Sequence, residues 1–288
     1  MSLDIGEAFQ EGLDRTFARN GLLLAAGFAV VALLLAVIQQ TLLIEGTAAM
    51  LEWFQGFSPD ELGLSQQEYD QQVTSLETQL EMLRESSPLA LGVPAGVAAA
   101  GLVVVALVGE AVAIVAVRTF GADGAGSVAR EDLTGNLLLA TLNGFVGKIV
   151  VYGLIFLGGL LLLVPGIFFA VAFFFVRQEV ALEDKNFVQA MADSWRFTKG
   201  HRIAVFALGL VLVIVTVVAE TAGGLVGFVS PLVAQVVTAV LGGLAAAFGA
   251  AVATRAYVQL DRDSATVDGT AGNGDPYDAA LGPDDIPE

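Results

Sequence analysis

Six long apolar runs are the feature that most constrains how this chain can fold. They cover residues 21–44, 90–117, 149–164, 167–181, 203–220 and 232–258. A helix rises about 1.5 Å per residue, so about 20 apolar residues cross a hydrocarbon layer about 30 Å thick. The pattern predicts an all-α fold, a polytopic membrane helix bundle. We expect about six transmembrane helices, arranged as three hairpins with cytoplasmic interfacial helices.

The composition excludes several classes of function. Of the 288 residues, 56% are hydrophobic and only 15% are charged, which is too apolar for one soluble core. The net charge of −17 argues against nucleic acid as a partner, because that needs a basic face. The chain has no cysteine, which excludes disulfides and zinc-thiolate sites. Acidic polar segments predict a halophilic protein, because salt screens carboxylate repulsion.

The third and fourth runs are short and closely spaced. Only Val164, Pro165 and Gly166 separate them, and a proline beside a glycine breaks a helix. We expect a tight hairpin at the outer surface here. The alternative is one long kinked helix.

Basic residues predict the orientation of the runs, because short loops rich in arginine and lysine stay in the cytoplasm. Those that flank the runs on one side are Arg15, Arg19, Arg118, Arg130, Arg177, Lys185, Arg196, Lys199, Arg202, Arg255 and Arg262. The segment 45–88 has a single basic residue, Arg84, among many acids. We therefore expect a cell-membrane protein with both termini in the cytoplasm. Residues 1–260 form the transmembrane domain and 45–88 an extracytoplasmic helical insertion within it.

Two segments outside the apolar runs, the insertion and the C-terminal segment, have sequence signals of their own. In the insertion, Ser58 and Ser65 each precede a glutamate by three residues, which predicts a short helix and then a longer one. The longer helix has one apolar stripe: Tyr69, Val73, Leu76, Leu80 and Leu83. It lies either on the bundle or headgroup layer, or forms a self-association face. Residues 261–288 have almost no large apolar residues and are expected to be a disordered acidic cytoplasmic tail.

Three six-residue stretches align with one another and indicate an internal repeat. They begin at Ala8, Ala140 and Ala190, and each has a small residue four positions later, before an outgoing run. We expect three similar units of interfacial helix plus hairpin. The first and third would lie flat on the membrane with apolar faces in contact with lipid. The residues of these faces are Phe9, Leu13, Phe17, Met191 and Trp195.

Four ionisable residues in or beside the runs are candidate functional residues: Glu110, Lys148, Arg177 and Glu220. A charge in a bilayer centre costs about 3 kcal/mol or more. If the third span begins at Leu137, Lys148 lies deep and can pair with Glu110. If the repeat holds, Lys148 lies at the inner surface, which is the interpretation we favour. Arg177 and Glu179 are either a relay or, as we favour, a snorkelling arginine beside a surface carboxylate, and Glu220 lies near water.

Several short motifs carry a family resemblance. They are residues 164–167, Arg177, Ala190, Ser194, Trp195, 197–200 and Arg202, with 4–8 and 14–16 at the start. Over residues 4–260 the chain resembles a loosely defined group of bacterial and archaeal membrane proteins, which includes the membrane domain of some glycerophosphoryl diester phosphodiesterases. The start and the acidic bias resemble an uncharacterised haloarchaeal branch. The resemblance implies a six-helix membrane domain and carries over no catalytic residue.

No cluster of catalytic or metal-ligating residues stands out in the sequence, so we expect neither an enzyme nor a cofactor. The first hypothesis is a structural or accessory membrane bundle. Its partners would be membrane lipids, and other membrane proteins or a second copy of the chain. The alternative is a transporter or lipid-handling permease with a polar path near Glu110, Lys148 and Gln235.

Overall fold

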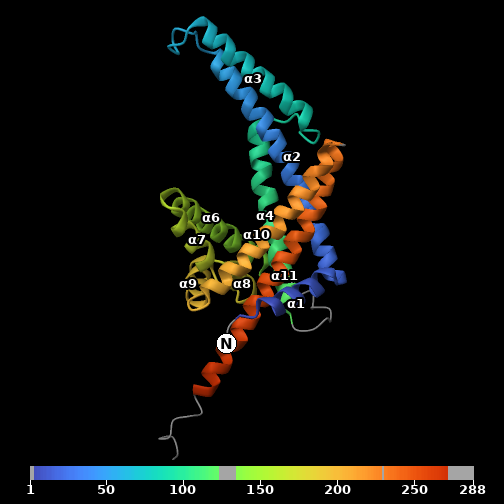
Figure 1. The fold of residues 1–288 in the computed structure, drawn as a ribbon, viewed down its shortest axis with the longest axis vertical. Helices are drawn as coiled ribbons and strands as arrows, with labels where there is room; N and C mark the ends of the chain where they lie inside the picture. The colour runs from blue at the N-terminus through green and yellow to red at the C-terminus, as the bar shows by residue number, and fades with distance from the viewer. Residues whose placement is uncertain (1–2, 123–133, 229, 272–288) are drawn as a thin grey trace, which may run out of the picture.

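The computed structural model describes residues 3–122, 134–228 and 230–271, and every regular element in these ranges is helical. The helices are α1 (Ile5–Phe17), α2 (Arg19–Gln55), α3 (Gln66–Ser86), α4 (Ala95–Gly121), α6 (Leu137–Leu161), α7 (Leu163–Ala172), α8 (Val176–Leu182), α9 (Phe187–Phe197), α10 (Arg202–Leu225) and α11 (Pro231–Ala271), with a 3₁₀ turn at Val226–Phe228 (Figure 1). The predicted all-α fold is confirmed.

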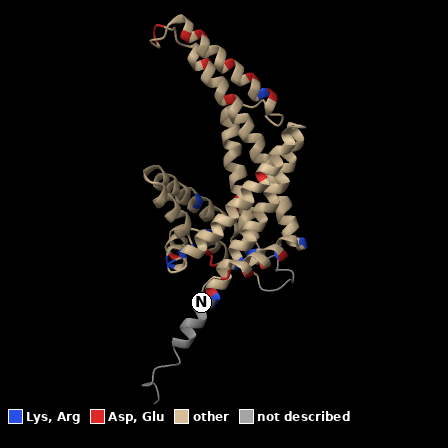
Figure 2. Cartoon of the chain, viewed as in Figure 1, with Lys and Arg blue, Asp and Glu red and all other residues tan. Residues whose placement is uncertain are grey.

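Six helical segments in the described ranges are long and apolar enough to cross a membrane, as predicted. They are α2, α4, α6, α7 with α8 (Leu163–Leu182), α10 with its 3₁₀ turn (Arg202–Phe228), and α11 (Pro231–Arg262). In Figure 1, α2, α4, α10 and α11 form a column and the α6–α7 hairpin extends to one side. The short helices α1, α8 and α9 lie at one end of it. We call this the basic end, because Figure 2 shows most Lys and Arg residues there.

At the opposite end, α2 extends beyond the bundle and pairs with α3 (Figure 1). The 37 residues of α2 span about 55 Å, well over the 30 Å or so of a hydrocarbon layer. Tyr69 of α3 stacks on Phe54 of α2 with ring centroids 5.2 Å apart, and Leu76 and Leu80 are buried. The apolar stripe therefore packs on the bundle's own helix.

Capping explains how the chain turns from α2 into α3. Ser65 caps α3 and Glu68 completes the predicted capping box. Ser58 makes the matching contact with Glu61, but the segment stays a turn instead of the short helix we expected. Gly63 follows at φ +67°, a left-handed conformation that ends the turn after too few residues for a helix.

Two polar residues inside α2 fix the segment that leads into α4. The Oε1 atom of Gln40 accepts the backbone N–H of Leu89 at 3.0 Å, and the Oγ1 atom of Thr41 accepts that of Leu91 at 2.8 Å. These side chains satisfy backbone donors that have no helical partner, which an apolar environment would otherwise penalise.

The break between α6 and α7 differs from the prediction. It falls at Leu162, whereas Pro165 and Gly166 lie in the first turn of α7. A proline fits there because the first N–H groups of a helix have no acceptor within it. A Cβ atom on Gly158 would lie 2.9 Å from the nitrogen of Gly166, so the two helices touch through glycine backbones. The hairpin itself is confirmed.

The last helix, α11, is longer than predicted. It continues to Ala271, so the first part of the segment expected to be disordered is helical, and the rest of that segment lies outside the described residues. Gly243 faces α2, where an added Cβ would lie 2.5 Å from the carbonyl oxygen of Ala25 and 2.7 Å from the nitrogen of Ala29. The helices approach this closely because dispersion replaces the hydrophobic effect between helices in a membrane.

The three aligned stretches make equivalent contacts at the basic end. Gly12 of α1 packs on Val252 of α11, Gly144 of α6 packs on α4, and Ser194 of α9 packs at the junction of α7 and α8. Each stretch thus contacts the last helix of another unit. The second unit differs from the expectation, because its stretch is continuous with α6 and forms no separate surface helix.

We predict opposite effects of alanine at two adjacent glycines of α11. Gly243→Ala places a methyl group against α2 and should lower the free energy of unfolding by about 1–3 kcal/mol, as overpacking does. Gly242 has no atom within 4 Å of an added Cβ, so Gly242→Ala should be neutral or stabilising through helix propensity. Unfolding in mixed SDS micelles measures both. Equal effects would contradict the α2–α11 contact.

Candidate functional site

The carboxylate of Glu110 is the centre of a polar junction between three helices. Glu110 lies within α4 and only 1% of its surface is exposed. Its Oε1 atom accepts the Nε–H of Arg177 at 2.8 Å, and its Oε2 atom accepts an Nη2–H at 3.1 Å. This paired geometry is the strongest arrangement that an arginine and a carboxylate can adopt. It joins α4 to the first turn of α8.

A glycine in α6 provides the space for this carboxylate. A Cβ atom added at Gly144 would lie 2.9 Å from Oε1 of Glu110, closer than real Cβ contacts come. Gly144 is the small residue of the second aligned stretch, so the repeat identified its position and the structure shows its role. It allows α6 to approach the carboxylate.

Lys148, one turn further along α6, is the third member of the junction. The helix begins at Leu137, well before the predicted start at residue 149, and this brings the Nζ atom of Lys148 to 3.9 Å from Oε2 of Glu110. The ammonium also lies 5.9 Å from the ring centre of Tyr152. Of the two interpretations of Lys148, the structure shows the one in which it pairs with Glu110, and 41% of the lysine side chain remains exposed.

Arg177 and Glu179 do not form the pair that the sequence predicted. Arg177 reaches back to Glu110, while Glu179 is buried and accepts a hydrogen bond from Lys185 at 2.6 Å. The reason is helical geometry, because residues two apart point to different sides of α8. The relay between Arg177 and Glu179 is corrected, and so is the surface carboxylate, because Glu179 is buried.

Lys185 links this second carboxylate to α9. Its ammonium lies 3.0 Å from Asp193, which also pairs with Arg196. The hydrogen bond from Lys185 holds the pKa of Asp193 below its usual range. Burial lowers the pKa of Lys185, but its hydrogen bonds to Glu179 and Asp193 outweigh this and raise it. A lowered carboxyl pKa stabilises the fold above the unfolded-state pKa, so this contact holds α9 at neutral pH.

The helix is interrupted between α7 and α8, and this interruption allows Arg177 to reach Glu110. Ser194 of α9 binds the backbone groups at this interruption. Its Oγ atom accepts the N–H of Phe175 at 3.2 Å and donates to the carbonyl of Ala172 at 3.0 Å. The serine is fully buried. It supplies the hydrogen bonds that the interrupted helix lacks.

Two further buried arginines tie α4 and α11 to other elements of the basic end. Arg118 donates to the carbonyl of Ala181 at 2.9 Å and pairs with Asp184 at 2.9 Å. Arg255 pairs with Glu11 of α1. Both lie near the predicted cytoplasmic end of an apolar run, which was the available signal, but their partners lie far away in sequence. Arg130, in the same predicted group, lies outside the described residues.

The other candidate polar residues stay apart from this junction. Glu220 is exposed near the far end of α10, as expected. The described hydrogen bonds and ion pairs do not connect Gln235 with Glu110 or Lys148. His201 occupies the N-cap position of α10, with no side-chain capping hydrogen bond. Within the described ranges, no group of three or more His, Asp or Glu residues is placed to hold a metal ion.

The predicted surface helices are present, with part of each apolar face turned inward. In α1, Phe9 packs edge-on against Phe248 of α11 at 4.8 Å, while Leu13 and Phe17 are exposed. In α9, Trp195 contacts Phe168 at 5.1 Å, and Met191 is half-buried against the core. On these two helices the exposed large apolar residues are Leu13 and Phe17 of α1 and Val188 of α9.

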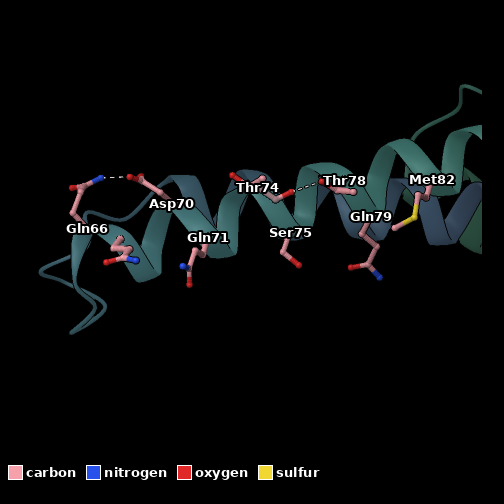
Figure 3. Close-up of a pocket in the computed structure, with 9 residues that line it drawn as sticks. Gln66, Asp70, Gln71, Thr74, Ser75, Thr78, Gln79 and Met82 are labelled. Atoms are coloured by element: carbon pink, nitrogen blue, oxygen red, sulfur yellow. Dashed lines mark hydrogen bonds between the residues drawn. The ribbon is translucent and has the colours of Figure 1, made fainter.

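A shallow hollow on the outward face of α3 is a second surface to consider. Figure 3 shows its lining of mostly uncharged polar side chains, in which Gln66 donates to Asp70 and Thr78 donates to the carbonyl of Thr74. These contacts are one turn apart within the same helix. They pair polar groups on the surface of α3 with one another, and they bring together no residues from different elements.

Six apolar helices around a buried ion-paired junction indicate a multi-pass membrane protein. More narrowly, the family described as domain of unknown function DUF7847 matches residues 3–260, and the chain belongs to it. No curated protein and no solved structure matches the chain.

We predict that Glu110 and Arg177 are energetically coupled. Removing one partner leaves a charge without compensation, so Glu110→Ala and Arg177→Ala should each destabilise the protein, and the double variant should lose less than the sum. A double-mutant cycle in mixed micelles should give a coupling of about 0.5–3 kcal/mol. Glu220→Ala, at an exposed carboxylate, is the control and should change stability by less than about 0.5 kcal/mol. Strict additivity of the two single variants would show that the pair contributes nothing.

Proposed function

We propose that this protein is a non-enzymatic structural or accessory membrane bundle that organises lipids or partner proteins through its surface helices. The observation that carries this proposal is α1, an amphipathic helix fixed to the bundle on one side and apolar on its free side. Ala8 and Gly12 are buried against the bundle, whereas Leu13 is 43% and Phe17 61% exposed.

The docking of α1 supports a fixed surface. Gly12 contacts the backbone of α11 closely, and Glu11 pairs with the buried Arg255. Beyond Leu13 and Phe17, an apolar groove continues between α10 and α11, lined by residues that include Ile214, Leu241 and Phe248. A helix held in this way presents its exposed apolar residues to acyl chains without paying the entropy of folding on contact.

The orientation belongs to the same proposal. We place the basic end, and with it α1 and α9, in the cytoplasm, because most of the arginines and lysines lie there while the α2–α3 hairpin is mainly acidic (Figure 2).

Photo-crosslinking tests the role of α1 directly. A benzophenone amino acid in place of Phe17 should form adducts with phospholipid in proteoliposomes and, in native membranes, with lipid or a defined membrane protein. The same residue in place of Glu7, an exposed residue of the first turn that lies to the other side of α1 from Leu13, is the matched control and should form few lipid adducts. Equal yields at the two positions would refute a lipid-facing helix.

A permease is the second candidate, and one observation favours it. The broken segment α7–α8 carries a charged residue at the junction, and broken helices with charged groups line the path in many transporters. A transporter needs water on both sides of the junction in turn, whereas a packed bundle is dry there. Val105 and Ala113 of α4, which flank Glu110, are both buried.

Single-cysteine labelling in this cysteine-free chain separates the two candidates. We expect Val105→Cys and Ala113→Cys to resist a membrane-impermeant thiol reagent in whole cells and in inverted vesicles. Exposed positions serve as positive controls: Gln71→Cys should react only from outside and Gln189→Cys only from inside. Labelling of 105 and 113 from opposite sides would favour the permease, and reversal of the two controls would overturn the orientation.

A further inference from the structure

The junction around Glu110 carries more positive than negative charge. One carboxylate from α4 faces one guanidinium from α8 and one ammonium from α6. A charge that is partly removed from water is unfavourable unless an opposite charge compensates it, and Lys148 and Arg177 share one carboxylate. The excess cation therefore favours a further anion at this place.

Both cations keep donors that the carboxylate does not use. Glu110 accepts from Nε and Nη2 of Arg177, and the described hydrogen bonds of that guanidinium leave its Nη1 group available. The ammonium of Lys148 lies 3.9 Å from Glu110, beyond hydrogen-bonding distance. The arginine side chain is 37% exposed and the lysine 41%, whereas the carboxylate is closed off at 1%. The junction therefore presents donors outward and its acceptor inward.

Contacts with α9 indicate the depth of this site. The N–H of Phe187, the first residue of α9, donates to Oδ1 of Asn143 at 3.2 Å, and a Cβ atom on Gly147 would lie 3.4 Å from the Cβ of Phe187. Lys148 is therefore next to the start of a surface helix. With α9 at the membrane surface, as the proposed function has it, this level corresponds to lipid headgroups, where phosphate groups are concentrated.

Tyr152 completes the surface. It lies one turn beyond Lys148 on α6, is 60% exposed, and its ring faces the ammonium. A tyrosine with an apolar ring and a polar hydroxyl is typical of the boundary between headgroups and acyl chains. We propose that Lys148 and Arg177, backed by Glu110, bind a phosphate group at the basic end, either the phosphodiester of a membrane lipid or a free phosphate ion.

Native mass spectrometry of the full chain in detergent tests this site with two probes, a short-chain phosphatidylglycerol and inorganic phosphate. Lys148→Gln should weaken binding about tenfold, the effect of losing one hydrogen bond to a charged group. Lys199→Gln, an exposed lysine on the same end of the protein, is the matched control and should bind as the wild type does. Glu110→Gln should strengthen binding, because it removes the negative charge. A purely structural role for Glu110 predicts no such gain.

The two probes distinguish the source of the phosphate. Binding of phosphatidylglycerol without binding of inorganic phosphate assigns the site to a lipid headgroup. Binding of inorganic phosphate that displaces the lipid assigns it to the free ion. Failure of both probes to bind, or an equal loss in Lys148→Gln and Lys199→Gln, overturns the proposal. None of these results depends on whether α1 contacts lipid or protein partners.

Discussion

A carboxylate among membrane-spanning helices must meet an opposite charge, because hydrocarbon offers it neither water nor hydrogen-bond donors. Glu110 meets this requirement through Arg177 and Lys148. Each of these two contacts requires a particular feature of the helix that carries the partner or of a neighbouring one. Arg177 reaches the carboxylate only because α7 and α8 are separated, and α6 comes close enough only because residue 144 is glycine. The approach of three helices thus depends on one buried charge.

The same end of the molecule is organised by other polar contacts of similar design. Ser194 completes the interrupted helix, Arg118 holds the loop after α8, and Arg255 holds α1. In each aligned unit a small residue allows close approach to a helix of another unit. Small residues and buried charges act together, because close backbone approach shortens the distance over which the charges interact. The opposite end depends instead on the apolar contact between α2 and α3.

The sequence predicted the spans well because hydropathy is a local property. The six runs and the capping box at Ser65 both follow from spacing along one helix. The partners of Arg177 and Lys148 could not be predicted in the same way, because they depend on where α6 begins and on how α8 is rotated. Nothing local distinguishes Leu137 from residue 149 as the first residue of the third span. The hairpin turn was displaced to Leu162 because a proline is compatible with a first helical turn as well as with a break.

The central claim is that the Glu110 junction lies beside α9 at headgroup depth. Spin labels at Ile149, an exposed neighbour of Lys148, and at Gln189 of α9 test it most directly in proteoliposomes. Depth is obtained from the relative accessibility of each label to oxygen and to a water-soluble nickel complex. We predict similar, shallow depths for the two labels. A label at 149 near the bilayer centre, with 189 at the surface, would contradict the claim.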